Sequence, residues 1–173
     1  MLKLLRPDAG RVPARGARFR LDGGFTLTEL VVTIAIAAVL ATLAVPSFNG
    51  IIASEHAKAA ASELYASLLT ARSEAVRLNQ QVTIAAGAGG WKHGWTTTSA
   101  GGTTVDSHGA MQGVDLPEGS GATAITYYPS GRLAPGTIAP SFVATATTGS
   151  AMSTQCVSID PTGTPYMKAG SAC

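Results

Sequence analysis

Charged residues make up only 13% of this 173-residue chain, and aromatic residues only 6%. Hydrophobic residues make up 46%. A disordered chain combines low hydrophobicity with high charge, so this composition argues against disorder throughout. The length allows one modest soluble domain beside a membrane segment.

Side chains suited to catalysis or metal binding are also few. His56, His93 and His108 lack the spacing of metal ligands. The run Asp106-Ser107-His108 holds the residue types of a catalytic triad, but a triad is assembled in space and not from consecutive residues, so we interpret this run as a polar loop. No Gly-Lys-Ser/Thr follows the glycine run 87–90, which excludes a phosphate-binding loop. We therefore expect no enzyme, no metal and no cofactor.

Cations are scarce in the second half of the chain. From residue 80 onward they are Lys92, Arg132 and Lys168, and four acidic residues give this region a net charge of −1. Nucleic-acid binding needs clustered Lys and Arg, because neutralising phosphates supplies much of the affinity. These three residues are the candidates for a weak DNA contact, and nucleic acid is not expected as the main partner.

The chain has two cysteines, Cys156 and Cys173. In an oxidising compartment they would pair, and a loop of this size stabilises the fold by roughly 3 kcal/mol in the chain-entropy model. Free thiols and metal ligation are the alternatives, but two separated cysteines without a nearby histidine make a poor zinc site. We predict the disulfide Cys156–Cys173.

What the sequence does have is a long apolar run, residues 25–45, in which Glu29 is the only charged residue. A helix of this length crosses a bilayer core of roughly 30 Å. A buried acid costs roughly 2.5–3.5 kcal/mol on insertion scales, so Glu29 needs a cationic partner. Cutting the chain after Gly24 would free an amine on Phe25, which could meet Glu29 of the same subunit or of a neighbour.

The segment before the apolar run is basic, with six cations and two acids among residues 1–24. By the positive-inside rule these cations hold the N-terminus in the cytoplasm, and the C-terminal part is exported. A secretory signal peptide would place its apolar region before the cut. Here the apolar run follows Gly24, so we expect the mature protein to keep its membrane segment.

Residues 25–79 are predicted to form one helix, because no Gly or Pro interrupts the stretch between Gly50 and Gly87. An apolar stripe at helical spacing is predicted to pack on the folded domain; it consists of Ala57, Ala61, Leu64, Leu68, Ala71, Ala75 and Leu78. Many of these residues are Ala, which permits close approach.

Residues 80–173 have a different composition, with 15 of the 20 Gly and 6 of the 9 Pro. Short β-branched or aromatic runs between turn signals predict an antiparallel sheet. The expected strands are 81–86, 91–98, 124–128, 137–146, 155–160 and 164–168, and 101–121 is expected to be a long loop with at most one strand. Trp91 and Trp95 are expected in the core rather than on a binding platform.

The motif Gly24-Phe25-Thr-Leu-Thr-Glu29, followed by about twenty apolar residues, resembles the signal of type IV prepilins and type II secretion pseudopilins. The resemblance implies that a prepilin peptidase cleaves after Gly24 and methylates Phe25. It also implies that Glu29 pairs subunits in a filament with other pilins or pseudopilins.

Three further motifs resemble the GspH/FimT branch of this class: 71–77, the pair Gly90-Trp91 and Gly94-Trp95, and 128–132. The implied fold is α+β and pilin-like, with a long N-terminal helix, transmembrane and then amphipathic, on an antiparallel β-rich head. The expected parts are a cleaved leader 1–24, a transmembrane helix 25–46, its amphipathic continuation 47–79 and a periplasmic head 80–173. The implied function is a minor pilin or pseudopilin of the inner membrane, and a pilus-tip DNA receptor is the alternative.

Overall fold

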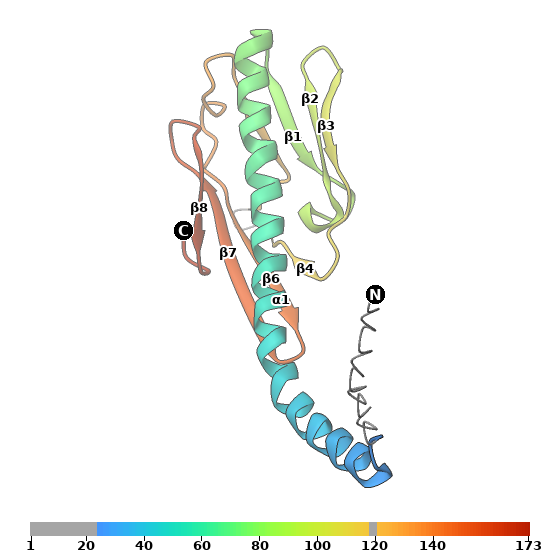
Figure 1. Ribbon diagram of the computed structural model, residues 1–173. Coiled ribbons are helices and arrows are strands. Elements are labelled where there is room, and N and C mark those ends of the chain that lie inside the picture. The colour runs from blue at the N-terminus through green and yellow to red at the C-terminus, as the bar shows by residue number, and fades with distance from the viewer. Residues whose placement is uncertain (1–23, 118–120) are drawn as a thin grey trace, which may run out of the picture. The chain divides into compact units, whose positions relative to one another are not determined.

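The computed structural model describes residues 24–117 and 121–173, apart from the side chains of residues 45 and 46. The expected leader, except for Gly24, lies outside the described residues. One long helix precedes all the strands, which confirms the predicted α+β class (Figure 1). The elements are α1 (Leu27–Leu78), β1 (Val82–Ala86), the 3-10 turn η1 (Trp91–His93), β2 (Trp95–Ser99), β3 (Thr104–His108), β4 (Val114–Asp115), β5 (Ala124–Tyr127), β6 (Ser141–Thr148), β7 (Ala151–Ile159) and β8 (Pro165–Ala169).

The chain divides into two compact units, residues 1–38 and 39–173. The described part of the first unit is the start of α1, and its side chains are exposed. The second unit contains the rest of α1 and every described strand.

The strands form two antiparallel sheets, ordered β3-β2-β1-β5 and β4-β6-β7-β8. The first sheet places β1 between β2 and β5, with Ile84 opposite Thr97 on one side and Ile125 on the other. The second sheet is built on the β6–β7 hairpin, in which Ser141 pairs with Ser158 and Thr148 with Ala151. In Figure 1 both sheets lie against α1: β1, β2 and β3 of the first sheet are on its right, and the second sheet crosses behind the helix from β8 on the left to β4 on the right.

The predicted apolar stripe of α1 faces the sheets. Six of its seven members are buried, and Leu78 is half-buried at the end of the helix. The stripe extends one turn further toward the N-terminus, to Ala53, which is fully buried. One core joins Leu64 and Leu68 of α1 to Ile84 of the first sheet and Phe142 of the second. Alanine suits this face because it allows strands to approach the helix closely.

Trp91 and Trp95 are buried, as expected, and they join the two sheets. The ring of Trp91 packs edge-on against Phe142 of β6, with 4.9 Å between centroids, and its Nε1 atom donates a hydrogen bond to the oxygen of Ala122. Trp95 stacks on His108 of β3 at 4.5 Å. Aromatic pairs of this kind stabilise a core beyond their buried area.

The predicted strand 91–98 is wrong at its start. Trp91 belongs to η1, and the strand begins only at Trp95. The break is at Gly94, which has a positive φ of 96° and packs against the backbone oxygen of His108 so closely that a Cβ would lie 2.2 Å from it. Only glycine fits there, because it has no Cβ and tolerates positive φ.

The expected loop 101–121 was also wrong, because it contains two strands, β3 and β4. Asp106, Ser107 and His108 therefore lie on an edge strand and not in a loop. Two other boundaries differ: β6 begins at Ser141 and not at 137, and β7 begins at Ala151, four residues before the predicted strand.

Candidate assembly site

The first turn of α1 carries Glu29, the acidic residue of the predicted cleavage and assembly motif. Glu29 Oε2 accepts hydrogen bonds from the backbone N–H of Thr26 at 2.9 Å and from its hydroxyl at 3.0 Å. In return, the Glu29 backbone N–H donates to Thr26 Oγ1 at 3.2 Å. This reciprocal arrangement is a capping box, which satisfies donors that the start of a helix leaves unpaired. The carboxylate is thereby bound to Thr26, the residue next to Phe25. Cleavage after Gly24 would create a free amine on Phe25.

The helix that follows is apolar on every side. Its stretch Leu27–Ala44 has a mean hydropathy of 2.2, and none of this stretch is buried by the rest of the protein. The exposed side chains include Leu30, Ile34, Ile36 and Leu40, each more than half exposed. A helix that is apolar all round is normally surrounded by lipid or by other protein. By length and composition this one can cross a membrane.

At the C-terminal end, the structure joins Cys156 to Cys173, with Cα atoms 5.7 Å apart. Cys156 is buried on β7, whereas Cys173 is exposed. The bond attaches Cys173 to the second sheet, three residues after the last backbone hydrogen bond to β7, which the Gly170 N–H donates to the Thr154 oxygen.

Two loops of the head cross beside α1. The Nε atom of Arg72 donates a hydrogen bond of 2.9 Å to the oxygen of Gly131. Gly163, with a φ of 89°, packs on the same turn, and a Cβ there would lie 2.5 Å from the Gly131 oxygen. In the second loop, Asp160 Oδ1 accepts hydrogen bonds from the Thr162 hydroxyl at 2.6 Å and from the Thr164 N–H at 2.9 Å.

Two groups near this crossing have shifted pKa values. The hydrogen bonds from Thr162 and Thr164 lower the pKa of Asp160, because they stabilise the charged carboxylate. Burial raises the pKa of the Tyr127 hydroxyl, an effect that the nearby charge of Arg72 partly offsets. Both groups belong to the core and loops of the head, so we interpret the crossing as structural.

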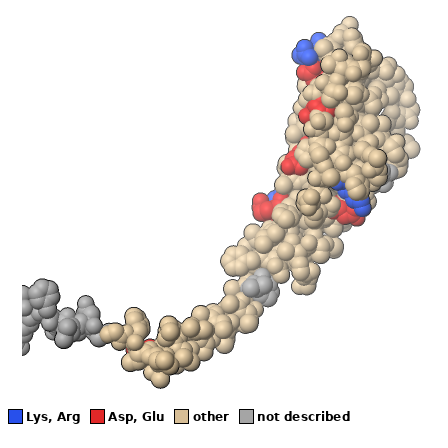
Figure 2. Space-filling model, turned by 90° about the vertical axis from the view of Figure 1, so that its right-hand side faces the viewer, with Lys and Arg blue, Asp and Glu red and all other residues tan. Residues whose placement is uncertain are grey.

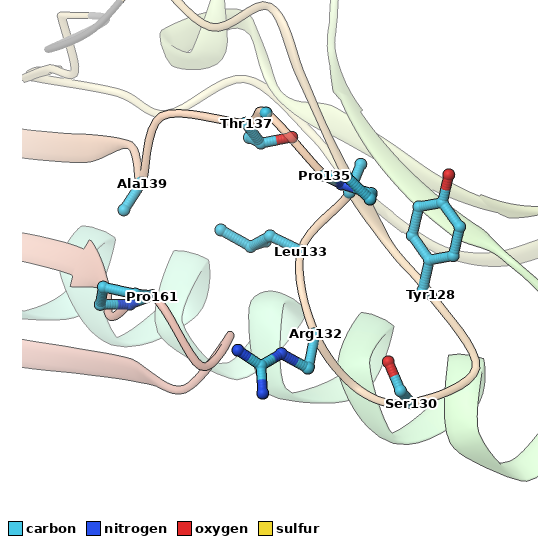
Figure 3. A pocket seen from close by; sticks show the side chains of 10 residues that line it. Tyr128, Ser130, Arg132, Leu133, Pro135, Thr137, Ala139 and Pro161 are labelled. Carbon is cyan, nitrogen blue, oxygen red and sulfur yellow. The ribbon is translucent and has the colours of Figure 1, made fainter.

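The three candidate DNA contacts lie on different elements. Lys92 is in η1 and lines a surface hollow with Asp115 and Pro117. Arg132 lines a different hollow, of about 430 Å³, whose walls come from residues 128–139 and Pro161. Figure 3 shows its guanidinium extending from the 128–132 turn toward the segment that carries Pro161. Lys168, on β8 opposite Cys156, lines neither hollow. The structure thus does not gather the three cations into one described site.

Metal ligands do not come together either. Among residues 24–117 and 121–173, no group of three His, Cys, Asp or Glu side chains is placed to hold a metal ion. His108 instead pairs with Glu63 of α1, with 3.1 Å between Nε2 and Oε2, and stacks on Trp95.

Neither the hydrogen bonding of Thr26 nor the contact of Arg72 with Gly131 was predicted from the sequence. The first had a signal, since Thr26-x-x-Glu29 is the spacing of a capping box. The second had none in spacing alone, because 59 residues separate the two partners.

A pilin-like subunit is the class that this fold and helix start define. The model of a prokaryotic N-terminal methylation motif matches residues 20–45, and the model of the type II transport protein GspH matches residues 60–165. The second match covers more than half of the chain. The protein therefore belongs to the GspH family.

Two crystal structures of the type IV minor pilin FimU from Pseudomonas aeruginosa (strain PAO1) have a similar fold. In space group P21 the identity is 24%, the match covers 68% of this chain and 90% of that chain, and the TM-score is 0.55. In space group P65 the identity is 25%, the match covers 67% of this chain and 98% of that chain, and the TM-score is 0.53. No curated protein matches the chain. The similarity confirms the pilin-like fold, and the family consists of structural subunits.

Proposed function

We propose that this protein is a minor pilin or pseudopilin that a prepilin peptidase cleaves between Gly24 and Phe25 and methylates on Phe25. The observation that carries the proposal is the coincidence of the methylation motif, residues 20–45, with the lone Glu29 at the start of an apolar helix. The family membership and the FimU-like fold support a filament of either the type II secretion or the type IV pilus kind.

We assign a different role to each successive segment of the chain. Residues 1–24 are a leader that the peptidase removes, and 25–46 anchor the subunit in the inner membrane and later in the filament core. Residues 47–79 continue the helix along the head, which is formed by 80–173 on the periplasmic side. The basic leader and the apolar stretch Leu27–Ala44 support this orientation.

Glu29 is the proposed assembly residue. The Thr26 N–H and hydroxyl, both neutral donors, form hydrogen bonds to one oxygen of its carboxylate. Among the described residues, no cationic side chain pairs with this carboxylate to neutralise its charge in lipid. The new amine of Phe25, from the same or a neighbouring subunit, would provide one. Pairing with a neighbour would favour two subunits together over one alone, because unpaired charges in lipid are costly.

The capping box allows a sharp test of this role. Glu29→Gln keeps a residue that can cap the helix but removes the charge, whereas Glu29→Ala removes both. If charge pairing drives assembly, both variants are cleaved at Gly24 but lost from the filament fraction. If capping alone matters, the Gln variant assembles normally and the pairing role is wrong. Thr33→Ala, a loss of one hydroxyl in the same apolar stretch, is the matched control and should assemble.

A DNA receptor at a pilus tip is the second candidate function. The observation in its favour is the exposed Arg132 at the wall of the 430 Å³ hollow. Replacing Lys92, Arg132 and Lys168 together by Ala tests it. A structural subunit keeps its filaments and its secretion or pilus function after this change. A receptor would keep filaments but lose a salt-sensitive DNA affinity.

A further inference from the structure

The β6–β7 hairpin carries no charged residue. From Leu133 to Ile159 the sequence contains no Asp, Glu, Lys or Arg. Charged side chains are found mostly at exposed positions of proteins, and this hairpin has exposed positions without any. At the closed end of this hairpin Thr147, Gly149 and Ser150 are exposed, and the Met152 side chain is 70% exposed. This end is accessible but uncharged.

The closed end of the hairpin lies against α1. A Cβ on Gly149 would lie 2.6 Å from Asn49 Nδ2, so the turn touches the helix at this residue. One turn further along α1, Ala53 is fully buried. Figure 1 shows the end of the hairpin beside α1, at the lower end of the head.

This contact lies close to the end of the apolar stretch along the helix. Asn49 comes five residues after Ala44, the last residue of the apolar stretch, which corresponds to a rise of about 7.5 Å. The headgroup layer adds roughly 5–8 Å to each side of the hydrocarbon core. Along the helix, the end of the hairpin therefore follows the apolar stretch within about the thickness of the headgroup layer.

The helix is also apolar at this depth. Phe48, Ile51 and Ile52 are 61%, 59% and 42% exposed. After Glu29, the next charged residue is Glu55, which lies beyond the contact with the hairpin. On the face shown in Figure 2, charged side chains are spread from the top of the head to below its middle, and the lowest part of the head shows none.

We infer that these four side chains, Phe48, Ile51, Ile52 and Met152, form an apolar collar that sits in the outer headgroup layer of a phospholipid bilayer while the subunit waits in the membrane. The closed end of the hairpin thereby contacts the bilayer surface. The inference rests on the proposed membrane-held subunit, because the collar continues directly from the apolar stretch.

The test uses the full chain, one copy per phospholipid nanodisc, with a nitroxide attached to one introduced cysteine. The native cysteines are joined to each other and do not react. The reporter is Met152→Cys, and Thr147→Cys, its cross-strand partner, repeats the measurement if the first variant misfolds. The matched control is Ile138→Cys, which is also apolar and 80% exposed but lies before the opposite end of β6. Leu40→Cys reports on the membrane stretch itself.

The measurement is the relative accessibility of each nitroxide to oxygen, which partitions into lipid, and to a water-soluble nickel complex. The expected result is an oxygen-to-nickel ratio at 152 and 147 several-fold higher than at 138. If position 40 favours oxygen while 152 and 147 match 138, the collar is wrong and the membrane anchor stands. If 152 and 147 become shielded only when two copies share a disc, a second copy covers the surface and lipid does not. If position 40 favours nickel, the proposed membrane anchor fails and the collar fails with it.

Discussion

Arg72 on α1 donates a hydrogen bond from its Nε atom to the backbone oxygen of Gly131, at 2.9 Å. The side chain is half-buried, and Gly163 packs against the same turn. One arginine therefore holds two loops of the head at a fixed position on the helix that is proposed to carry the subunit into a filament.

Replacing Arg72 by Ala should lower the free energy of unfolding by about 1–2 kcal/mol, because a charge-assisted hydrogen bond is lost and the Gly131 oxygen is left without its donor. Urea unfolding of the mature chain in detergent, followed by near-ultraviolet circular dichroism of the buried tryptophans, measures this. Arg77→Ala is the control, since Arg77 pairs with Glu74 on the exposed face of the helix and should contribute little. Equal effects of the two substitutions would contradict the role of Arg72.

Gly163 is expected to be intolerant of any side chain. Gly163→Ala forces a Cβ to within 2.5 Å of the Gly131 oxygen and also strains the backbone at a φ of 89°. The strain alone costs about 1–2 kcal/mol, so the total loss of unfolding free energy should exceed 2 kcal/mol. Gly136→Ala is the matched control, with a φ of 78° and nothing within 4 Å of the added atom. This control measures the backbone strain without the close contact. If Gly136→Ala lowered the free energy of unfolding as much as Gly163→Ala does, the close contact with the Gly131 oxygen would be unimportant.

The disulfide should contribute about 3 kcal/mol to stability, because it closes a loop of 17 residues. Replacing both Cys156 and Cys173 by Ala removes this contribution and lowers the unfolding midpoint. The same shift should appear when the wild-type protein is unfolded with a reductant, and the double variant should not respond to the reductant. A wild-type midpoint that ignores the reductant would contradict a stabilising disulfide.

Asp160 should make the stability of the head sensitive to acid. The Thr162 and Thr164 hydrogen bonds lower the pKa of this carboxyl in the folded state. Because the pKa is lower in the folded protein, Asp160 stabilises the fold at any pH above 3.8, the ordinary pKa of Asp. This stabilisation is lost as the pH falls from 3.8 through the pKa of the folded state. Asp160→Asn should therefore flatten the acid limb of a plot of unfolding midpoint against pH. Asp115→Asn, a loss of one exposed acid on β4, is the control and should leave the limb unchanged.

Much of the fold could be predicted because helix signals in this chain are strong. The helix was predicted over 25–79 and spans Leu27–Leu78, since its apolar period is uninterrupted by Gly or Pro after Gly50. The burial of Trp91 and Trp95 followed from their size. The edge strand β3 escaped prediction because its polar sequence, Thr104–His108, shows little apolar alternation, and pairing with β2 holds it in place.

The candidate site could be predicted only where its residues are close in sequence. Gly24, Phe25 and Glu29 lie within six residues, and the match of the methylation motif covers them. The crossing of Arg72, Gly131 and Gly163 depends on tertiary packing, so spacing could not reveal it. For the same reason, a count of the cations after residue 80 could not show that Lys92, Arg132 and Lys168 lie on separate elements.

The most direct test of the central claim is the mass of the N-terminal peptide of the protein, purified from membranes of cells that contain a prepilin peptidase. Cleavage after Gly24 predicts a peptide that begins at Phe25 and carries one methyl group. A chain that keeps its leader, or begins elsewhere without a methyl group, would contradict the account.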